Sequence, residues 1–175
     1  KQEQQLLADS EEGGRKRTPR LEPDGTGLPE LLRHLQVSDF EEKKYTSLMN
    51  RLTRLFPAIL QAKTVPCVIN VFMESDEGAR QPAKVPGSRI VFKLAGSQRE
   101  VAAPLVSEGA LFLLAFFCVG ASPSATRHLL IEQPETGIHL GALREVMTLL
   151  GELSSGGAGR GPVQVLATTH SPYAL

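Results

Sequence analysis

The order strand, helix, strand in the last third of the chain restricts the fold more than any other feature of this sequence. Residues 128–132 (HLLIE) and 163–169 (VQVLATT) are short apolar runs, and each predicts a strand that is buried on both faces. Between them, apolar side chains recur at helical spacing over residues 141–153. This pattern is typical of a right-handed parallel crossover. The sequence therefore predicts an α/β fold with a parallel sheet at its core.

Upstream of this unit, the spacing of leucines predicts a helical segment. Residues 23–25 (Pro-Asp-Gly) form a turn signal, and Leu28 opens a run of leucines at helical spacing. A second helix is expected to begin near Ser38, where acidic residues fall in the first turn, and to stop at Pro57. Residues 1–20 are polar and of mixed charge, which predicts a frayed helix end followed by a loop.

A change to period-two spacing then predicts an antiparallel β-hairpin. Residues 65–73 (VPCVINVFM) and 89–94 (RIVFKL) have the alternation and the β-branched content of strands. The polar residues 74–88 contain glycine and proline and predict a long mobile loop between them. Residues 108–119 predict an apolar helix. The most apolar run, residues 110–121, is too short to span a membrane and is better suited to a buried helix.

We expect the chain to divide into stretches that differ in the periodicity of their apolar residues. These are a polar linker or frayed helix end (1–20), a helical subdomain (21–64), a β-hairpin segment (65–100) and the α/β core (101–175). The chain begins at Lys1 and ends at Leu175 directly after an apolar strand pattern, which we interpret as the back half of a larger domain.

The charge balance excludes several classes of protein. The 175 residues carry 19 Lys and Arg against 19 Asp and Glu, so a uniformly basic nucleic-acid coat or membrane binder is excluded. An aromatic content of 5% without tryptophan argues against a stacking platform for single strands. Cys67 and Cys118 lie in apolar runs without the spacing of a zinc site or a redox pair. They predict buried thiols in a reducing, cytoplasmic compartment, and no signal peptide opens the chain.

Three short motifs lie at predicted strand or helix ends in the last third of the chain. Ser107 and Gly109 open the apolar helix, where a hydroxyl and free amides can bind an anion; they also fit an ordinary helix N-cap. Glu132 ends the first apolar strand, where a carboxylate can hold Mg²⁺ beside phosphates; an exposed acid before a proline turn is the alternative. His170 follows the second strand in Thr-Thr-His-Ser-Pro and is placed near the same sheet edge, although it also fits a structural histidine.

The order of these motifs resembles the second half of an ABC-type ATPase head, and most of all the RecF- and OLD-like group of ATPases. The resemblance depends on three motifs: Ser-x-Gly at a helix start, an apolar strand ending in Glu-Gln-Pro-Glu-Thr-Gly-Ile-His, and a strand ending in Thr-Thr-His-Ser-Pro. The resemblance covers residues 104–175 strongly and the upstream part weakly. It implies a P-loop nucleoside triphosphatase fold, with an inserted helical segment and an antiparallel hairpin.

The resemblance also implies roles for individual residues. Ser107 and Gly109 match the signature, which grips the γ-phosphate of ATP held by the opposite protomer. Glu132 matches the Walker B acid that supports Mg²⁺, and Gln133 falls where the family has the glutamate that polarises the attacking water. His170 matches the switch histidine that senses the γ-phosphate. The D-loop segment, which lies along the dimer seam, corresponds to Thr136, Gly137 and His139.

The sequence departs from the family pattern at several positions. An amide at Gln133 can orient water but cannot accept its proton, which predicts slow turnover or an ATP-locked dimer. Ala110 replaces a polar residue of the signature, and Leu140 replaces the usual proline. No G-x-x-x-x-G-K-[ST] loop occurs in these residues, so this chain alone is expected to bind ATP very poorly.

The resemblance implies an ATPase head that dimerises around ATP and Mg²⁺ and acts in DNA repair or in defence against phage and plasmids. The alternative is a catalytically weak, ATP-dependent dimerisation switch or regulatory subunit. A transporter ATPase subunit and a structural α/β domain fit the motifs less well. The partners that the resemblance implies are a second copy of the chain, DNA, and a nuclease domain or partner subunit. No association with a membrane is expected. The candidate DNA contacts are Arg15, Lys16, Arg17, Arg20, Lys43 and Lys44.

Overall fold

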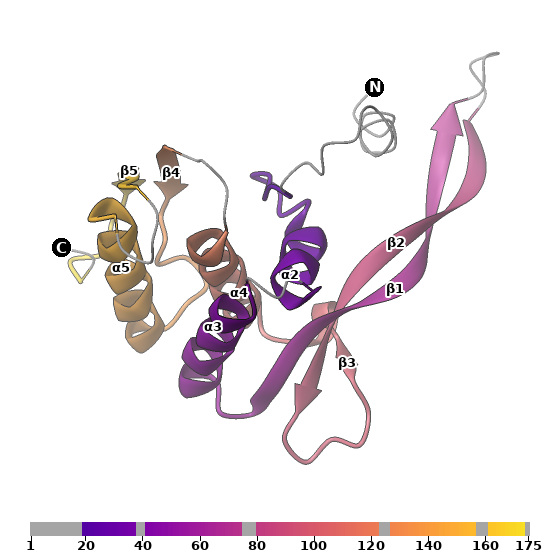
Figure 1. The fold of residues 1–175 in the computed structure, drawn as a ribbon, viewed down its shortest axis with the longest axis horizontal. Helices are drawn as coiled ribbons and strands as arrows, with labels where there is room; N and C mark the ends of the chain where they lie inside the picture. Colours follow the sequence, from indigo (N-terminus) through magenta and orange to yellow (C-terminus); the bar gives the residue numbers. More distant parts are fainter. Residues whose placement is uncertain (1–18, 38–40, 75–79, 123–126, 157–160, 174–175) are drawn as a thin grey trace.

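The computed structural model describes residues 19–37, 41–74, 80–122, 127–156 and 161–173. A group of packed helices lies at the centre of the molecule, with a long β-hairpin on one side and a short parallel sheet on the other (Figure 1). The predicted features at residues 1–18, including Arg15, Lys16 and Arg17, lie outside the described residues. No helix in the described part of the chain is long and apolar enough to cross a membrane.

The two predicted helices of the first segment are present. α2 (Leu28–Val37) follows a turn at residues 23–24 and buries the leucines that set its spacing. α3 (Glu42–Leu55) begins at Glu42 rather than near Ser38, and it ends just before Pro57, whose ring cannot continue a helix. Its apolar face, which includes Leu52, is buried against the same core.

The hairpin is longer than the sequence predicts. β1 (Ile59–Glu74) and β2 (Arg80–Leu94) pair antiparallel along their length, so β1 begins inside the stretch that was expected to be helical. The prediction of a loop over residues 74–88 is wrong, because residues 80–88 belong to β2. A loop was predicted because this segment contains prolines and a glycine, which usually mark loops.

Prolines are tolerated in this ribbon because of their register. Pro66, Pro82 and Pro86 all belong to the same alternating set of cross-strand pairs as Thr64. The Thr64 amide points away from the partner strand, since it donates to Gln36 Oε1 at 3.1 Å. The backbone N–H of a residue in this set does not bond to the partner strand. A proline at such a position therefore removes no interstrand hydrogen bond.

A single hydrophobic core joins the helices, the base of the hairpin and the crossover unit. α4 (Glu108–Ala121), which follows a short strand β3 (Val101–Ala102) and a 3₁₀ turn (Ala103–Leu105), is its central helix. Cys118 is fully buried as predicted, and burial raises the pKa of its thiol. The same prediction is wrong for Cys67, which lies half-buried on the projecting hairpin.

The predicted crossover is confirmed. β4 (His128–Glu132) and β5 (Gln164–Thr168) pair in parallel, and α5 (Leu140–Ser154) connects them. The prediction that both strands are buried on both faces is wrong, because Leu130 is 74% exposed and Leu166 is 66% exposed. Their neighbours Leu129 and Val165 pack toward the core on the opposite face. Among the described residues nothing covers the outer face of this two-stranded sheet, which is why its apolar side chains are exposed.

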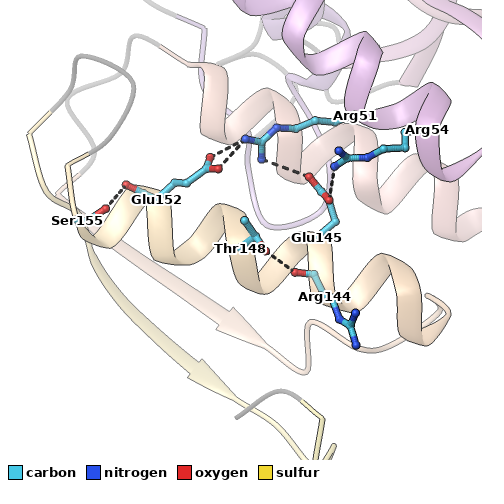
Figure 2. A network of polar contacts seen from close by, with 7 residues as sticks. All are labelled: Arg51, Arg54, Arg144, Glu145, Thr148, Glu152 and Ser155. Atoms are coloured by element: carbon cyan, nitrogen blue, oxygen red, sulfur yellow. Dashed lines mark hydrogen bonds and ion pairs between the residues drawn. The ribbon is translucent and has the colours of Figure 1, made fainter.

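Ion pairs fix the crossover helix against the helical segment. Arg51 of α3 donates to both oxygens of Glu152 in α5, at 2.7 and 2.8 Å, and Arg54 pairs with Glu145 (Figure 2). Both bonds to Glu152 come from a single nitrogen, Nη2, whereas Nη1 lies 3.6 Å from Glu145, so Arg51 contacts two carboxylates of α5. These contacts therefore hold α5, and with it the β4–β5 sheet, in a defined position relative to α3.

Candidate functional site

Two of the predicted site residues lie at one edge of the parallel sheet. Glu132 is the last residue of β4 and pairs in register with Thr168, the last residue of β5. His170 follows shortly after, and both Glu132 and His170 are exposed. The carboxyl edge of a parallel sheet is where open α/β folds bind ligands. The topology thus brings residues 132 and 170 to the same edge of the sheet, and both are exposed there.

Gln133 forms the turn that leaves this edge. Its φ is +46°, and it is the one residue other than glycine with a positive φ in the described part of the chain. Its amide donates to the Thr168 carbonyl at 2.9 Å, and its carbonyl accepts from the Thr136 amide at 2.9 Å. A left-handed conformation at a residue with a Cβ is unfavourable, and such residues cluster at functional sites. These bonds hold Gln133 beside the strand end, directly after Glu132.

Glu135 has no role in the sequence prediction, yet it bonds directly to the histidine loop. Its Oε1 accepts from the Thr169 hydroxyl at 2.9 Å and from the His170 amide at 2.8 Å. Burial raises the pKa of Glu135, but hydrogen bonds from its own amide, the His170 amide and the Thr169 hydroxyl outweigh this and hold the pKa below its ordinary value. A sequence signal existed, because Glu135 lies in the turn after one strand and Thr169 follows the adjacent parallel strand.

The start of α4 packs against the segment that follows Glu135. Gly109 is buried, and a Cβ built on it would lie 2.6 Å from the carbonyl oxygen of Gly137. Gly137 itself has a φ of +75°, which a glycine adopts without strain. The structure therefore gives Gly109 a packing reason to lack a side chain. Its predicted contact with a phosphate stays a prediction.

Ser107 stands at the N-cap of α4 with its side chain exposed. Its carbonyl accepts from the amides of Ala110 and Leu111, at 3.0 and 3.3 Å. Its hydroxyl caps no amide of the first turn, so the ordinary capping role that the sequence also allowed is not performed by this side chain. A hydroxyl that is not engaged in capping is available to a ligand.

The other residues of the predicted D-loop lie on the exposed turn between β4 and α5. Thr136 and Gly137 are exposed, and the Thr136 hydroxyl lies 3.5 Å from Gln133 Oε1. His139 is the N-cap of α5, where its Nδ1 accepts from the Ala142 amide at 3.3 Å. Its ring also meets Phe56 edge-on, with centroids 6.0 Å apart. His139 therefore has a structural role at the helix start, whatever role it has at a dimer seam.

The donor set allows Mg²⁺ only together with a phosphate ligand. In the described ranges no group of three or more His, Cys, Asp or Glu side chains could hold a metal ion. Mg²⁺ is usually held by one or two carboxylates, with water and substrate phosphates filling its other positions. Glu132, exposed at the strand end, fits that arrangement as the single carboxylate. The residues present are thus consistent with Mg²⁺ bound jointly with a nucleotide.

Two hollows on the described part of the surface lie away from this sheet edge. One of about 480 Å³ runs along α3 and includes Lys43, and another of about 330 Å³ lies beside Tyr45 and Lys93. Neither is lined by a predicted site residue. Of the candidate DNA contacts in the described residues, Arg20 and Lys43 are exposed, whereas Lys44 pairs with Glu41 at 2.8 Å.

The chain matches the model of a known protein family. A family model described as "AAA domain, putative AbiEii toxin, Type IV TA system" matches residues 15–175. This match includes the helices, the hairpin and the whole crossover unit. No curated protein matches the chain.

Proposed function

Because the chain belongs to this family of AAA domains, which have the α/β fold of P-loop nucleoside triphosphatases, we propose that it is part of a RecF- and OLD-like ATPase head. In this proposal the chain supplies the signature, the Walker B acid and the switch histidine. The AAA family is one of ATP-binding domains, usually with Mg²⁺. The narrower assignment rests on the motif order of residues 104–175.

One observation carries the proposal. Glu132 ends β4, His170 follows the end of the adjacent parallel strand β5 by two residues, and the Gln133 amide bonds to the Thr168 carbonyl between them. A nucleotide bound at this edge would meet a carboxylate, an amide side chain and an imidazole within one small region. Each of these groups suits one part of phosphate chemistry.

Bound Mg·ATP would supply the phosphoanhydride bond and neutralise charge on the phosphates. Glu132 would hold the metal through its carboxylate, directly or through water. Gln133 would orient a water molecule through its amide but could not take up the proton. His170 would donate a hydrogen bond to the terminal phosphate, and Ser107 would do so from the opposite protomer.

The phosphate-cradling loop has to come from outside these residues, since no G-x-x-x-x-G-K-[ST] occurs among them. We therefore assign the head's full activity to an assembly that contains such a loop. The head would dimerise around two nucleotides, with each site built from Ser107 of one copy and from Glu132 and His170 of the other. The cellular settings we propose are DNA repair and defence against phage or plasmids. The family description adds a toxin–antitoxin system as a third setting.

A second candidate function is favoured by Gln133. Without a carboxylate at this position the site has no general base next to the attacking water. The dimer would then close on ATP and stay closed, acting as a switch rather than a motor. The two functions share the same binding residues and differ in the rate of hydrolysis.

The Walker B assignment predicts a loss of Mg²⁺-dependent binding when Glu132 is replaced. In the assembly that includes the phosphate loop, Glu132→Ala is expected to weaken Mg·ATP binding by about tenfold or more, because a charged ligand of the metal is lost. Titration calorimetry with a non-hydrolysable ATP analogue, with and without Mg²⁺, measures the change.

The matched control is Glu100→Ala, which removes a carboxylate that pairs with Lys63 at 2.6 Å, outside the strand-end site. It should leave Mg·ATP affinity unchanged. Equal affinity in the wild type and in Glu132→Ala, with both proteins folded by circular dichroism, would remove Glu132 from the site. If the wild-type assembly itself fails to bind Mg·ATP, the proposed function is wrong.

A further inference from the structure

We propose that Glu135 is the positioning residue of the histidine loop: one of its carboxylate oxygens fixes the backbone of His170 to the turn that follows β4. The effect of Glu135 on ATP turnover rests on the proposed function, because it acts through the position of His170. The hydrogen bonds themselves do not depend on that function.

One oxygen of Glu135 accepts two hydrogen bonds from the histidine loop. Glu135 Oε1 accepts from the Thr169 hydroxyl and from the His170 amide, at 2.9 and 2.8 Å. The Thr169 hydroxyl oxygen in turn accepts from the Ser171 amide at 3.0 Å. Three consecutive loop residues are therefore connected to a single carboxylate oxygen. Bonds to an ionised acceptor are stronger than those between neutral groups.

The sheet does not hold this loop. The parallel pairing of β4 and β5 ends at Glu132 and Thr168, and the Gln133 amide makes the last bond across, to the Thr168 carbonyl. Beyond that point the His170 amide has a side-chain acceptor in place of a strand partner. A loop held by one side chain can change position when that side chain moves, whereas a strand in a ladder cannot do so alone.

The turn that carries Glu135 also contacts α4. Glu135 lies between Gln133, with its positive φ, and Gly137, whose carbonyl faces Gly109. A chain of contacts thus leads from the start of α4 through this turn to His170.

Glutamine and alanine at position 135 are expected to have different effects, because the two oxygens of Glu135 have different surroundings. Oε2 is buried and has no hydrogen-bond partner in the described residues. Glutamine would keep an acceptor for Thr169 and His170 but would place an amide donor where Oε2 now lies. Alanine would remove the acceptor entirely. We therefore expect Glu135→Gln to keep the loop close to its wild-type position and to abolish its response to pH.

The first test uses the 175-residue chain and needs no nucleotide. In ¹⁵N–¹H spectra, Glu135→Ala is expected to speed hydrogen exchange of the His170 amide about tenfold or more, because its acceptor is gone. Glu135→Gln should leave that exchange within about threefold of the wild-type rate, because the acceptor oxygen remains. Core amides of α4 and α5, read in the same spectrum, report whether each variant is folded.

Titration to low pH gives the second readout. The carboxylate is ionised at neutral pH, and its hydrogen bonds are lost as the pH falls through its lowered pKa. The His170 amide shift should therefore show an inflection below the usual range for glutamate. The inflection should vanish in Glu135→Gln and persist in Glu132→Gln, which neutralises the neighbouring acid at the same sheet edge.

The third readout is turnover in the ATP-competent assembly. Glu135→Ala is expected to lower kcat about tenfold with little change in KM, because His170 is misplaced while the binding groups remain. If wild-type turnover is present and kcat is unchanged in Glu135→Ala, the Glu135 proposal fails and the proposed function survives. If turnover is absent but the His170 amide responds as expected, the proposed function fails and Glu135 still positions the loop. An unchanged His170 amide in a folded Glu135→Ala variant overturns the inference outright.

Discussion

Replacing Gln133 with glutamate is expected to raise ATP turnover by about 10²-fold, because a positioned general base typically contributes this much or more. Gln133 directly follows Glu132 at the strand end, and its backbone is held by bonds to Thr168 and Thr136. A glutamate at this position has the same length, so its carboxylate reaches the place of the present amide. The measurement is steady-state phosphate release by the assembly that includes the phosphate loop.

Gln133→Ala is the matched control, because it keeps the turn and removes the side chain. It should leave turnover at or below the wild-type level. A wild-type protein with no turnover at all, which gains activity only as Gln133→Glu, would identify the chain as a natural switch rather than a slow ATPase. No acceleration in a folded Gln133→Glu variant would place the attacking water elsewhere.

Adding one methyl group at Gly109 is expected to destabilise the protein by about 1–3 kcal/mol, the usual cost of overpacking. The new Cβ would lie 2.6 Å from the Gly137 carbonyl oxygen, which belongs to the backbone and cannot rotate away. Either α4 or the turn before α5 must therefore move. Thermal or urea unfolding of Gly109→Ala measures the cost, and the predicted site should lose Mg·ATP affinity at the same time.

Replacing another helical glycine with alanine should stabilise the protein instead of destabilising it. Gly151 lies in α5 with open space around its Cβ position. Alanine there removes the helix penalty of glycine and should stabilise the protein by about 0.5–1 kcal/mol. Equal effects at Gly109 and Gly151 would mean that the close approach of α4 to Gly137 has no energetic consequence.

The periodic elements could be predicted because each one has a single strong pattern. The leucine spacing from Leu28 and the apolar runs at residues 128–132 and 163–169 correspond to α2, β4 and β5. The hairpin could not be predicted at full length, because the prolines of β2 look like loop residues unless their register is known. Register depends on pairing with β1, which no local pattern contains. Likewise, the exposed outer face of β4 and β5 depends on what packs there.

Part of the candidate site followed from topology. Parallel strands end at a common edge, so Glu132 and the loop that carries His170 could be predicted to lie at the same edge from the order of the strands alone. The same order places Glu135 near the loop after β5, but its bond to the His170 amide depends on a turn conformation that no sequence pattern contains. The reason for a glycine at position 109 also needed the structure, because Gly137 is distant in sequence. Contacts of this kind come from packing rather than from spacing.

The central claim is that two copies of the chain share each nucleotide site, and mixing two inactive variants tests it most directly. Ser107→Glu places a negative charge where the signature would meet phosphate, and Glu132→Ala removes the carboxylate that we propose binds the metal. Ser107 is exposed at a helix start, where an acidic residue is tolerated. Each variant alone is expected to lack turnover in the ATP-competent assembly.

In a mixture of equal amounts, half of the dimers should contain one copy of each variant, and each of these has one intact site. Turnover should therefore recover to about one quarter of the wild-type rate, if subunits exchange freely and sites act independently. Subunit exchange is verified by mass measurement of the mixed dimer. A mixed dimer that forms but stays as inactive as its parents would contradict the shared site and place Ser107 and Glu132 in the site of a single chain.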